Sequence, residues 1–177
     1  MNRLILIFGF FILLISCKST KISYESEFKI SDDSVNLYAF IGKKISVLEF
    51  DPNENNTEVV TDTVFGKVFK STPYIMDYAF KCKYRIEKNV FNELKTKTID
   101  FVAYDHYGIA KFKNYKYIIL YIPLDKEDGN YYHQKYQFDP VERTKNGTWQ
   151  GLNGESIESL FNDKKNGVLT ARSLFDK

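Results

Sequence analysis

Cysteine, histidine and proline are scarce in this 177-residue chain, and the shortages of cysteine and histidine argue against disulfide-rich and His-rich architectures. The chain has two cysteines, two histidines and four prolines. Two cysteines, Cys17 and Cys82, cannot form a disulfide framework, so apolar burial must hold the core together. Two histidines, His106 and His133, give little material for a His-rich metal site or a catalytic triad.

No charge of one sign dominates either. Lys and Arg number 25 and Asp and Glu number 23, without a run of five or six like charges. Such a surface has no basic field to gather nucleic acid, so we predict no nucleic-acid partner. Glycine-rich phosphate loops, Gly-x-Ser-x-Gly, His-Glu-x-x-His and paired-cysteine metal motifs are also missing from the sequence. We therefore predict no cofactor and no metal.

A long apolar run lies at the N-terminus. Arg3 gives a positive start, residues 4–15 are twelve consecutive apolar residues, and Ser16 precedes Cys17. The run is shorter than the roughly 20 residues of a membrane span, and its layout is typical of a secretory signal peptide. The alternatives are an uncleaved anchor helix, or a buried hydrophobic helix in which the cysteine is incidental.

The segment Leu14-Ile15-Ser16-Cys17 resembles the lipobox of bacterial lipoproteins. The resemblance implies cleavage before Cys17, lipidation of its thiol, and a protein held at the membrane of a bacterial cell envelope without spanning it. Because Lys18 is not the aspartate that retains many enterobacterial lipoproteins in the inner membrane, the resemblance favours the outer membrane in a Gram-negative source. The oligomeric state is left open.

We therefore expect a signal peptide over residues 1–16, a lipidated Cys17 with a polar tether to residue 33, and a single domain over residues 34–177. Residues 80–87 alternate strictly between apolar and charged, which indicates a strand with one solvated face. Residues 115–124 are almost continuously apolar, which is typical of a central strand covered on both faces. Further strands are expected at residues 37–50 with a bulge or bend at Gly42, at 63–70, at 99–105, and at 131–138 after an Asp128-Gly129 turn.

One C-terminal helix is expected over about residues 155–165. Asn153 is its expected cap, Ile157, Leu160 and Phe161 form its apolar stripe, and Asn166-Gly167 is its expected end. Six strands with little helix predict a mainly β domain whose antiparallel sheet forms a closed or partly open barrel.

Several segments also resemble netrin-like and metalloproteinase-inhibitor (TIMP-like) domains. They are Ala39–Ile45, Phe80–Ile86, Ile99–Val102 and Tyr115–Tyr121, in that order along the chain. The resemblance implies an OB-type five-stranded barrel with a helix packed against it. It implies no inhibitory residue here, because lipidation of Cys17 would block the free N-terminal cysteine through which that family chelates zinc, and the family's disulfides are absent.

Few residues have the chemistry for catalysis. Cys82 shares the apolar face of its strand, where burial makes a thiol inert, so we expect it to fill the core. Asp105, His106 and His133 are the residues that a hydrolase or metal-dependent enzyme would use. Neighbouring residues on a strand point to opposite faces, so Asp105 would not orient His106, and the two histidines meet only if their strand ends converge. Otherwise both are surface histidines near loops.

Aromatic residues near the C-terminal half suggest a binding surface instead. Alternation along residues 131–138 places His133 and Lys135 on the face opposite Tyr132, Tyr136 and Phe138. With Tyr107 and Trp149 nearby, Tyr131, His133 and Lys135 would form an adaptable binding patch. The alternative is that Tyr131 packs under a loop or under the C-terminal helix.

Three functions remain open. The leading hypothesis is a lipid-anchored, non-enzymatic envelope domain that binds a protein or glycan partner through the patch. The second is an envelope hydrolase or metal-dependent enzyme that uses Asp105, His106 and His133. The third is a structural subunit of an envelope complex that docks through the helix Glu155–Lys165.

Overall fold

The computed structural model describes residues 28–57, 59–65 and 67–175. The signal peptide, Cys17 and the first part of the expected tether lie outside the described residues, so the predictions for them remain predictions. Within the described part, no helix is both long enough and apolar enough to cross a membrane.

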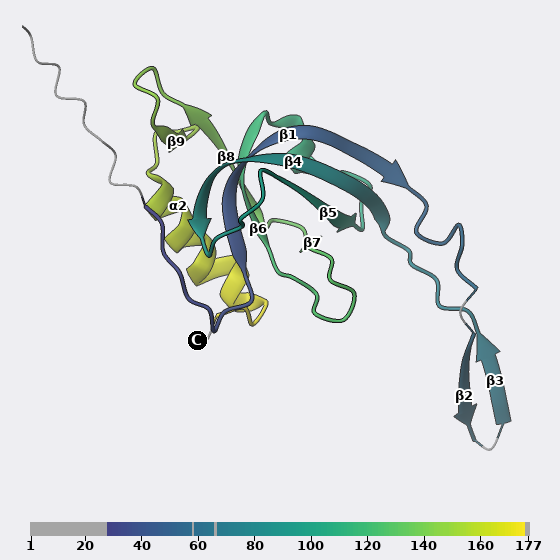
Figure 1. Ribbon diagram of the computed structural model, residues 1–177. Coiled ribbons are helices and arrows are strands. Elements are labelled where there is room, and N and C mark those ends of the chain that lie inside the picture. The colour runs from purple at the N-terminus through teal and green to yellow at the C-terminus, as the bar shows by residue number, and fades with distance from the viewer. Residues whose placement is uncertain (1–27, 58, 66, 176–177) are drawn as a thin grey trace, which may run out of the picture.

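A mixed seven-stranded sheet organises the molecule (Figure 1). Its spatial order is β7-β5-β4-β1-β6-β8-β9. The strands are β1 (Tyr38–Phe50), β4 (Tyr78–Phe91), β5 (Thr98–Asp105), β6 (Tyr117–Ile122), β7 (Tyr132–His133), β8 (Phe138–Arg143) and β9 (Trp149–Gly151). Neighbouring strands are antiparallel, except that β7 runs parallel to β5 over two residue pairs.

The expected mainly β fold with one C-terminal α-helix is confirmed, but the closed antiparallel barrel is wrong. The expected hairpin through Asp128-Gly129 is short: Leu124 bridges Tyr131, and the N–H groups of Asp125 and Tyr132 donate to the Asn130 and Pro123 carbonyls. The chain does not continue along β6 beyond this point, because Tyr132 and His133 pair as β7 with β5. Strand β8 then returns to pair with β6. Strands β7 and β9 therefore form opposite edges and leave the sheet open. The resemblance to netrin-like domains itself remains a prediction.

Both faces of the sheet are covered, by different parts of the chain. Along β1, Phe40 points to one face while Ala39 and Ile41 point to the other, as the alternation of a strand requires. The first face curls around Phe112 of the short helix η1 (Lys111–Asn114), and the second is covered by the C-terminal helix α2 (Ile157–Lys164). The result is two apolar clusters with one sheet between them.

Three strand predictions are confirmed. In β4, Phe80, Cys82 and Tyr84 are buried, and Cys82 is a core residue whose pKa burial raises to about 12. Residues 118–122 of β6 are buried on both faces. Gly42 lies at a register shift of β1 against β4, where an added Cβ would lie 3.0 Å from the rings of Phe40 and Tyr84.

Helix α2 begins later than expected, and the helical segment continues beyond the expected end. Its cap is Ser156, whose hydroxyl oxygen accepts the Ser159 N–H at 3.0 Å, whereas the Asn153 side chain donates to Glu155. Asn166-Gly167 does not end it, because a π-helical turn, η2 (Lys165–Leu169), follows directly. Leu169 is fully buried, so this extra turn adds an apolar contact to the helix-covered face.

The chain joins the packed body before the expected end of the tether. Phe28 packs on Phe161 with ring centroids 5.7 Å apart, and Ile30 pairs with Phe91. The Asn92 amide then donates to the carbonyls of residues 32, 35 and 37, at 2.9–3.1 Å. Residues 28–37 are thereby held against the end of β4.

A separate two-stranded ribbon projects from the body between β1 and β4 (Figure 1). It consists of β2 (Val60–Val64) and β3 (Lys67–Ser71), and we call residues 51–77 the arm. The single strand expected over residues 63–70 is wrong, because a turn follows Val64, where Phe65 has a φ of +50°. Every described residue of β2 and β3 is exposed.

Candidate binding site

The site lies at the turn between β7 and β8, where the structure differs from the prediction made from the sequence. A continuous strand over residues 131–138 is wrong, because β7 ends at His133 and residues 134–137 form a turn. The expected alternation is therefore lost: His133 is 3% exposed instead of lying on the outer face with Lys135. Tyr136 takes a φ of +71°, a strained conformation for a bulky residue.

Under this turn is a small recess of about 10 Å³, room for about one water-sized group. Phe80, Phe112 and Phe138 form apolar walls. Its polar lining includes Asp105 and His133, and the turn residues Lys135, which is half-buried, and Tyr136, which is exposed, also border it. The Asp105 carboxylate and the His133 imidazole therefore lie in apolar surroundings beneath the turn.

His133 is the most unusual group of the recess. Its ring lies 4.5 Å from the Phe112 ring, between centroids, and 6.2 Å from the rings of Phe101 and Phe138. Neither ring nitrogen has a hydrogen-bond partner of ordinary geometry among the described residues. Burial, with a smaller effect from nearby Arg172, lowers the pKa of His133 to about 3. The imidazole is therefore neutral at physiological pH, with one N–H donor and one bare nitrogen acceptor.

An exposed aromatic and cationic surface adjoins the recess. The Lys135 Nζ lies 4.0 Å from the centre of the Tyr107 ring and 5.2 Å from that of Tyr136, both within the range of cation–π attraction. Tyr107 and Tyr136 are 70% and 53% exposed. The Tyr107 N–H donates to Asp105 Oδ1 at 2.9 Å, which ties this surface to the recess. We call Tyr107, Lys135 and Tyr136 the aromatic patch.

The C-terminal helical segment holds the turn through hydrogen bonds to its backbone carbonyls. Arg172 donates to the Lys135 carbonyl at 2.8 Å, and Lys164 Nζ donates to the Tyr136 and Phe138 carbonyls at 3.1 Å each. Lys164 also pairs with Asp139 at 2.8 Å. Because both cations bind backbone oxygens, the side chains of Lys135 and Tyr136 are left for the surface.

Asp139 links this support to the sheet. The Tyr121 hydroxyl donates to Asp139 Oδ2 at 2.8 Å. Burial raises the pKa of Asp139 in spite of Lys164, and burial also raises the pKa of Tyr121 well above its usual value. The carboxylate and the Lys164 ammonium are therefore mutually dependent, each about 15% exposed.

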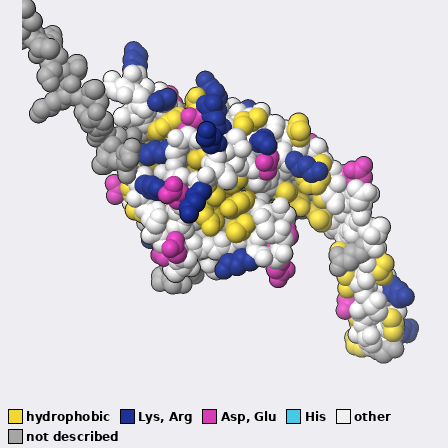
Figure 2. All heavy atoms as spheres, viewed as in Figure 1, with side chains coloured by type: hydrophobic (Ala, Val, Ile, Leu, Met, Phe, Trp, Pro, Cys, Tyr) yellow, Lys and Arg dark blue, Asp and Glu magenta, His cyan; other side chains and the backbone are white. Residues whose placement is uncertain are grey.

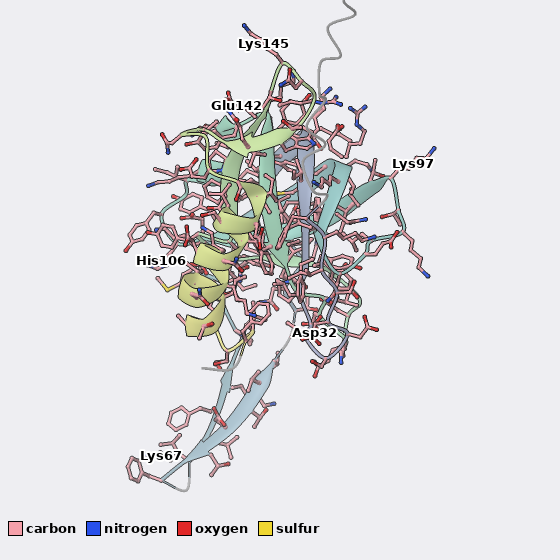
Figure 3. The ribbon with its side chains drawn as sticks, turned by 90° about the vertical axis from the view of Figure 1, so that its left-hand side faces the viewer. Asp32, Lys67, Lys97, His106, Glu142 and Lys145 are labelled. Atoms are coloured by element: carbon pink, nitrogen blue, oxygen red, sulfur yellow. The ribbon has the colours of Figure 1, made fainter. Side chains whose placement is uncertain are left out.

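The remaining predicted residues lie apart from the recess lining. Tyr131 packs edge-on against Tyr38 at 5.5 Å, and Trp149 is buried near Tyr117 in the helix-side cluster. The side chain of His106 is 64% exposed at the surface, and its Nδ1 lies 2.9 Å from Asp77 Oδ1 (Figure 3). The structure thus brings Asp105, His133, Lys135 and Tyr107 together and leaves His106 paired elsewhere.

The sequence missed two features of the surface. Tyr136 was expected on the same strand face as Tyr132 and Phe138, whereas the turn directs it outward. Within the arm only a strand over residues 63–70 was expected, yet nine of the seventeen exposed large apolar residues among the described ones belong to the arm (Figure 2). A phenylalanine next to a glycine between two β-rich segments was the signal that could have revealed its turn.

Comparisons with protein-family models, with curated proteins and with solved structures found no match. Among the described residues, no group of three or more His, Cys, Asp or Glu side chains is placed to hold a metal ion. The function is therefore inferred from the site's own residues.

Proposed function

We propose that this protein is a lipid-anchored, non-enzymatic binding domain of a bacterial cell envelope, and that it holds its partner with the aromatic patch. The observation that carries the proposal is the Lys135 ammonium 4.0 Å over the Tyr107 ring, beside the recess. Exposed tyrosines provide large contact areas at little entropic cost, and a cation among them adds polar recognition.

The geometry supports binding more than hydrolysis. A general base works best when its pKa lies near the operating pH, whereas the pKa of His133 is about 3. His106 pairs with Asp77 at the surface and does not line the recess that holds Asp105. The hydrolase alternative needs Asp105, His106 and His133 to act together, and this arrangement gives it no support.

The envelope address comes from the N-terminal sequence. The lipobox-like segment ending in Cys17 supports export, cleavage and lipidation, with the outer membrane favoured in a Gram-negative source. Residues 18–27 separate Cys17 from the first described residue, Phe28. A partner in the envelope, of protein or glycan nature, would then meet a domain tethered beside the membrane.

Site-specific crosslinking in intact cells tests the proposal. A photoreactive amino acid replaces Tyr107 in one strain and Lys97, an exposed residue away from His106, in a control strain (Figure 3). We expect a discrete crosslinked product from position 107 and none from position 97. Equal products at both positions, or none at 107, would contradict the proposal.

The arm favours a second function, a structural subunit of an envelope complex. The apolar stripe of helix α2 already packs against the sheet, since Ile157 and Phe161 are fully buried. The face of α2 that remains for docking is therefore mainly polar. The arm instead exposes apolar side chains and both outer edges of its ribbon. A strand of a partner protein could extend such an edge through backbone hydrogen bonds.

A further inference from the structure

We infer that the recess beneath the aromatic patch receives a hydroxyl group of a carbohydrate, so that the partner held by the patch is a glycan. The inference rests on the proposed function and names the chemistry of its ligand. Three properties of the site lead to it: the unused nitrogens of His133, the size and charge of the recess, and the aromatic surface around it.

The ring nitrogens of His133 can pair with a group that donates or accepts a hydrogen bond. A neutral imidazole has one N–H donor and one bare nitrogen acceptor, and the His133 ring nitrogens have no partner of ordinary geometry among the described residues. Buried polar groups are rarely left without partners, because each such loss is costly. A hydroxyl group in the recess can pair with one of the two nitrogens whichever tautomer is present, since it both donates and accepts.

The size of the recess selects a small group. At about 10 Å³ it has room for about one water-sized group, such as a hydroxyl, and not for a carboxamide or a phosphate. Its polar lining also disfavours an anion: Asp105 is 8% exposed and would repel one. Two lysines, Lys111 and Lys135, border the recess, and the ammonium of Lys135 lies over the Tyr107 ring.

The aromatic patch suits a sugar ring. Aromatic faces carry partial negative charge and attract the polarised C–H groups of a pyranose, while its hydroxyls can reach Lys135. Tyr107 and Tyr136 are both more than half exposed. Arg172 and Lys164 bind the carbonyls of Lys135 and Tyr136, so the strained turn is held before a ligand arrives, which lowers the entropic cost of binding.

Binding to defined oligosaccharides tests the inference. The probes are maltotriose, cellotriose and chitotriose, titrated at millimolar concentration into the full-length lipidated protein in detergent micelles. Variants Tyr107→Ala and His133→Phe test the patch and the recess. Tyr74→Ala is the matched control, because Tyr74 is 74% exposed on the arm and Tyr107 is 70% exposed on the patch.

We expect at least one trisaccharide to bind and to shift the NMR signals of the His133 ring nitrogens in the wild-type protein. Binding should weaken about tenfold or more in Tyr107→Ala and in His133→Phe, which is the effect of about 1.4 kcal/mol. It should be unchanged in Tyr74→Ala. The ring-nitrogen shift reports on the recess even if a variant folds poorly.

Two results would overturn the inference. One is that none of the three trisaccharides binds, and the other is that binding leaves the His133 ring signals unmoved and survives His133→Phe. The proposed function fails separately: it falls if position 107 gives no specific crosslink in cells. A position-107 crosslink to a protein that persists after enzymatic removal of glycans would keep the binding function and reject the carbohydrate.

Discussion

At the residue scale, the site depends on a histidine that is buried where the alternation of a strand would have exposed it. His133 sits among aromatic rings as a neutral imidazole, and burial holds its pKa at about 3. A side chain that stays neutral inside the fold but gains a proton when the chain unfolds makes stability depend on pH. That dependence is measurable.

We expect the free energy of unfolding to fall as the pH drops. An unfolded histidine has a pKa of about 6.5, whereas His133 in the folded protein has a pKa of about 3. Between these two pH values the unfolded state therefore binds a proton that the folded state does not bind. The loss from His133 alone should approach about 1.4 kcal/mol per pH unit in that window, and it is absent above it. Urea unfolding at several pH values measures it.

His133→Phe should flatten this part of the pH profile, because it removes the titrating group. It should also raise stability at neutral pH by about 1 kcal/mol, since it removes unpaired buried polar atoms. His106→Phe is the control, because it replaces the other histidine, whose side chain is 64% exposed, and leaves His133 in place. A slope that persists in His133→Phe would contradict the assignment.

The pair of Lys164 and Asp139 gives a second prediction at this scale. Lys164→Met removes the ammonium that lies 2.8 Å from Asp139 and leaves that carboxylate buried with less compensation. Breaking one partner of a buried ion pair costs about 3 kcal/mol or more, so urea unfolding should show a loss of that order. The double variant Lys164→Met with Asp139→Asn should recover part of it, and a double variant as unstable as the single one would contradict the coupling.

At the element scale, β2 and β3 differ from every other strand. The strands of the main sheet contribute buried residues to a core, whereas β2 and β3 expose all their described residues. A two-stranded ribbon on its own is at best marginally stable in water. Exposed apolar side chains such as Phe65 and Phe69 therefore favour a role in contact with a partner.

Replacing residues 51–78 by Asn-Gly should leave the body folded. Phe50 and Ala79 are register partners at the end of the β1–β4 ladder, so a two-residue turn can join them. We expect the free energy of unfolding to change by about 1 kcal/mol or less, because the ribbon is exposed and the one main-sheet residue that is removed, Tyr78, is 50% exposed. Chemical denaturation measures this, and a large loss would show that the arm supports the core.

The same scale shows where local sequence patterns suffice. Strict alternation over residues 80–87 predicted a strand because one face of β4 meets the core and the other meets solvent. Alternation failed over residues 131–138, where Gln134 and Gln137 close a turn and the Lys164 ammonium binds its carbonyls. Lys164 comes from elsewhere in the chain, so periodicity alone cannot anticipate its contact with the turn.

At the scale of the whole molecule, the open sheet depends on one crossing. The segment after β6 turns back briefly and then passes to β5, where Tyr132 and His133 pair in parallel with Val102 and Ala103. This crossing places His133 beside Phe101 and Phe112 and so forms the recess.

The membrane anchor is tested at this scale as well. If Cys17 is lipidated as proposed, Cys17→Ser should release the protein from the membrane fraction, because the acyl chains would then have no attachment point. The fold should be unchanged, since all the described members of the two apolar clusters lie at or beyond Phe28. Cell fractionation with immunodetection measures the release. Mass spectrometry of the native protein showing an unmodified Cys17 would contradict the lipoprotein assignment.

The sequence alone determined the strands with regular alternation, the bulge at Gly42, the apolar stripe of the C-terminal helix and the burial of Cys82. Each of these depends on neighbours within a few residues, because strand and helix periodicity decide which side chains are buried. Only the tertiary structure decided the parallel β5–β7 pairing, the open sheet, the burial of His133 and the isolation of the arm. These depend on contacts between distant segments, such as Lys164 with the Tyr136 carbonyl, which no local pattern encodes.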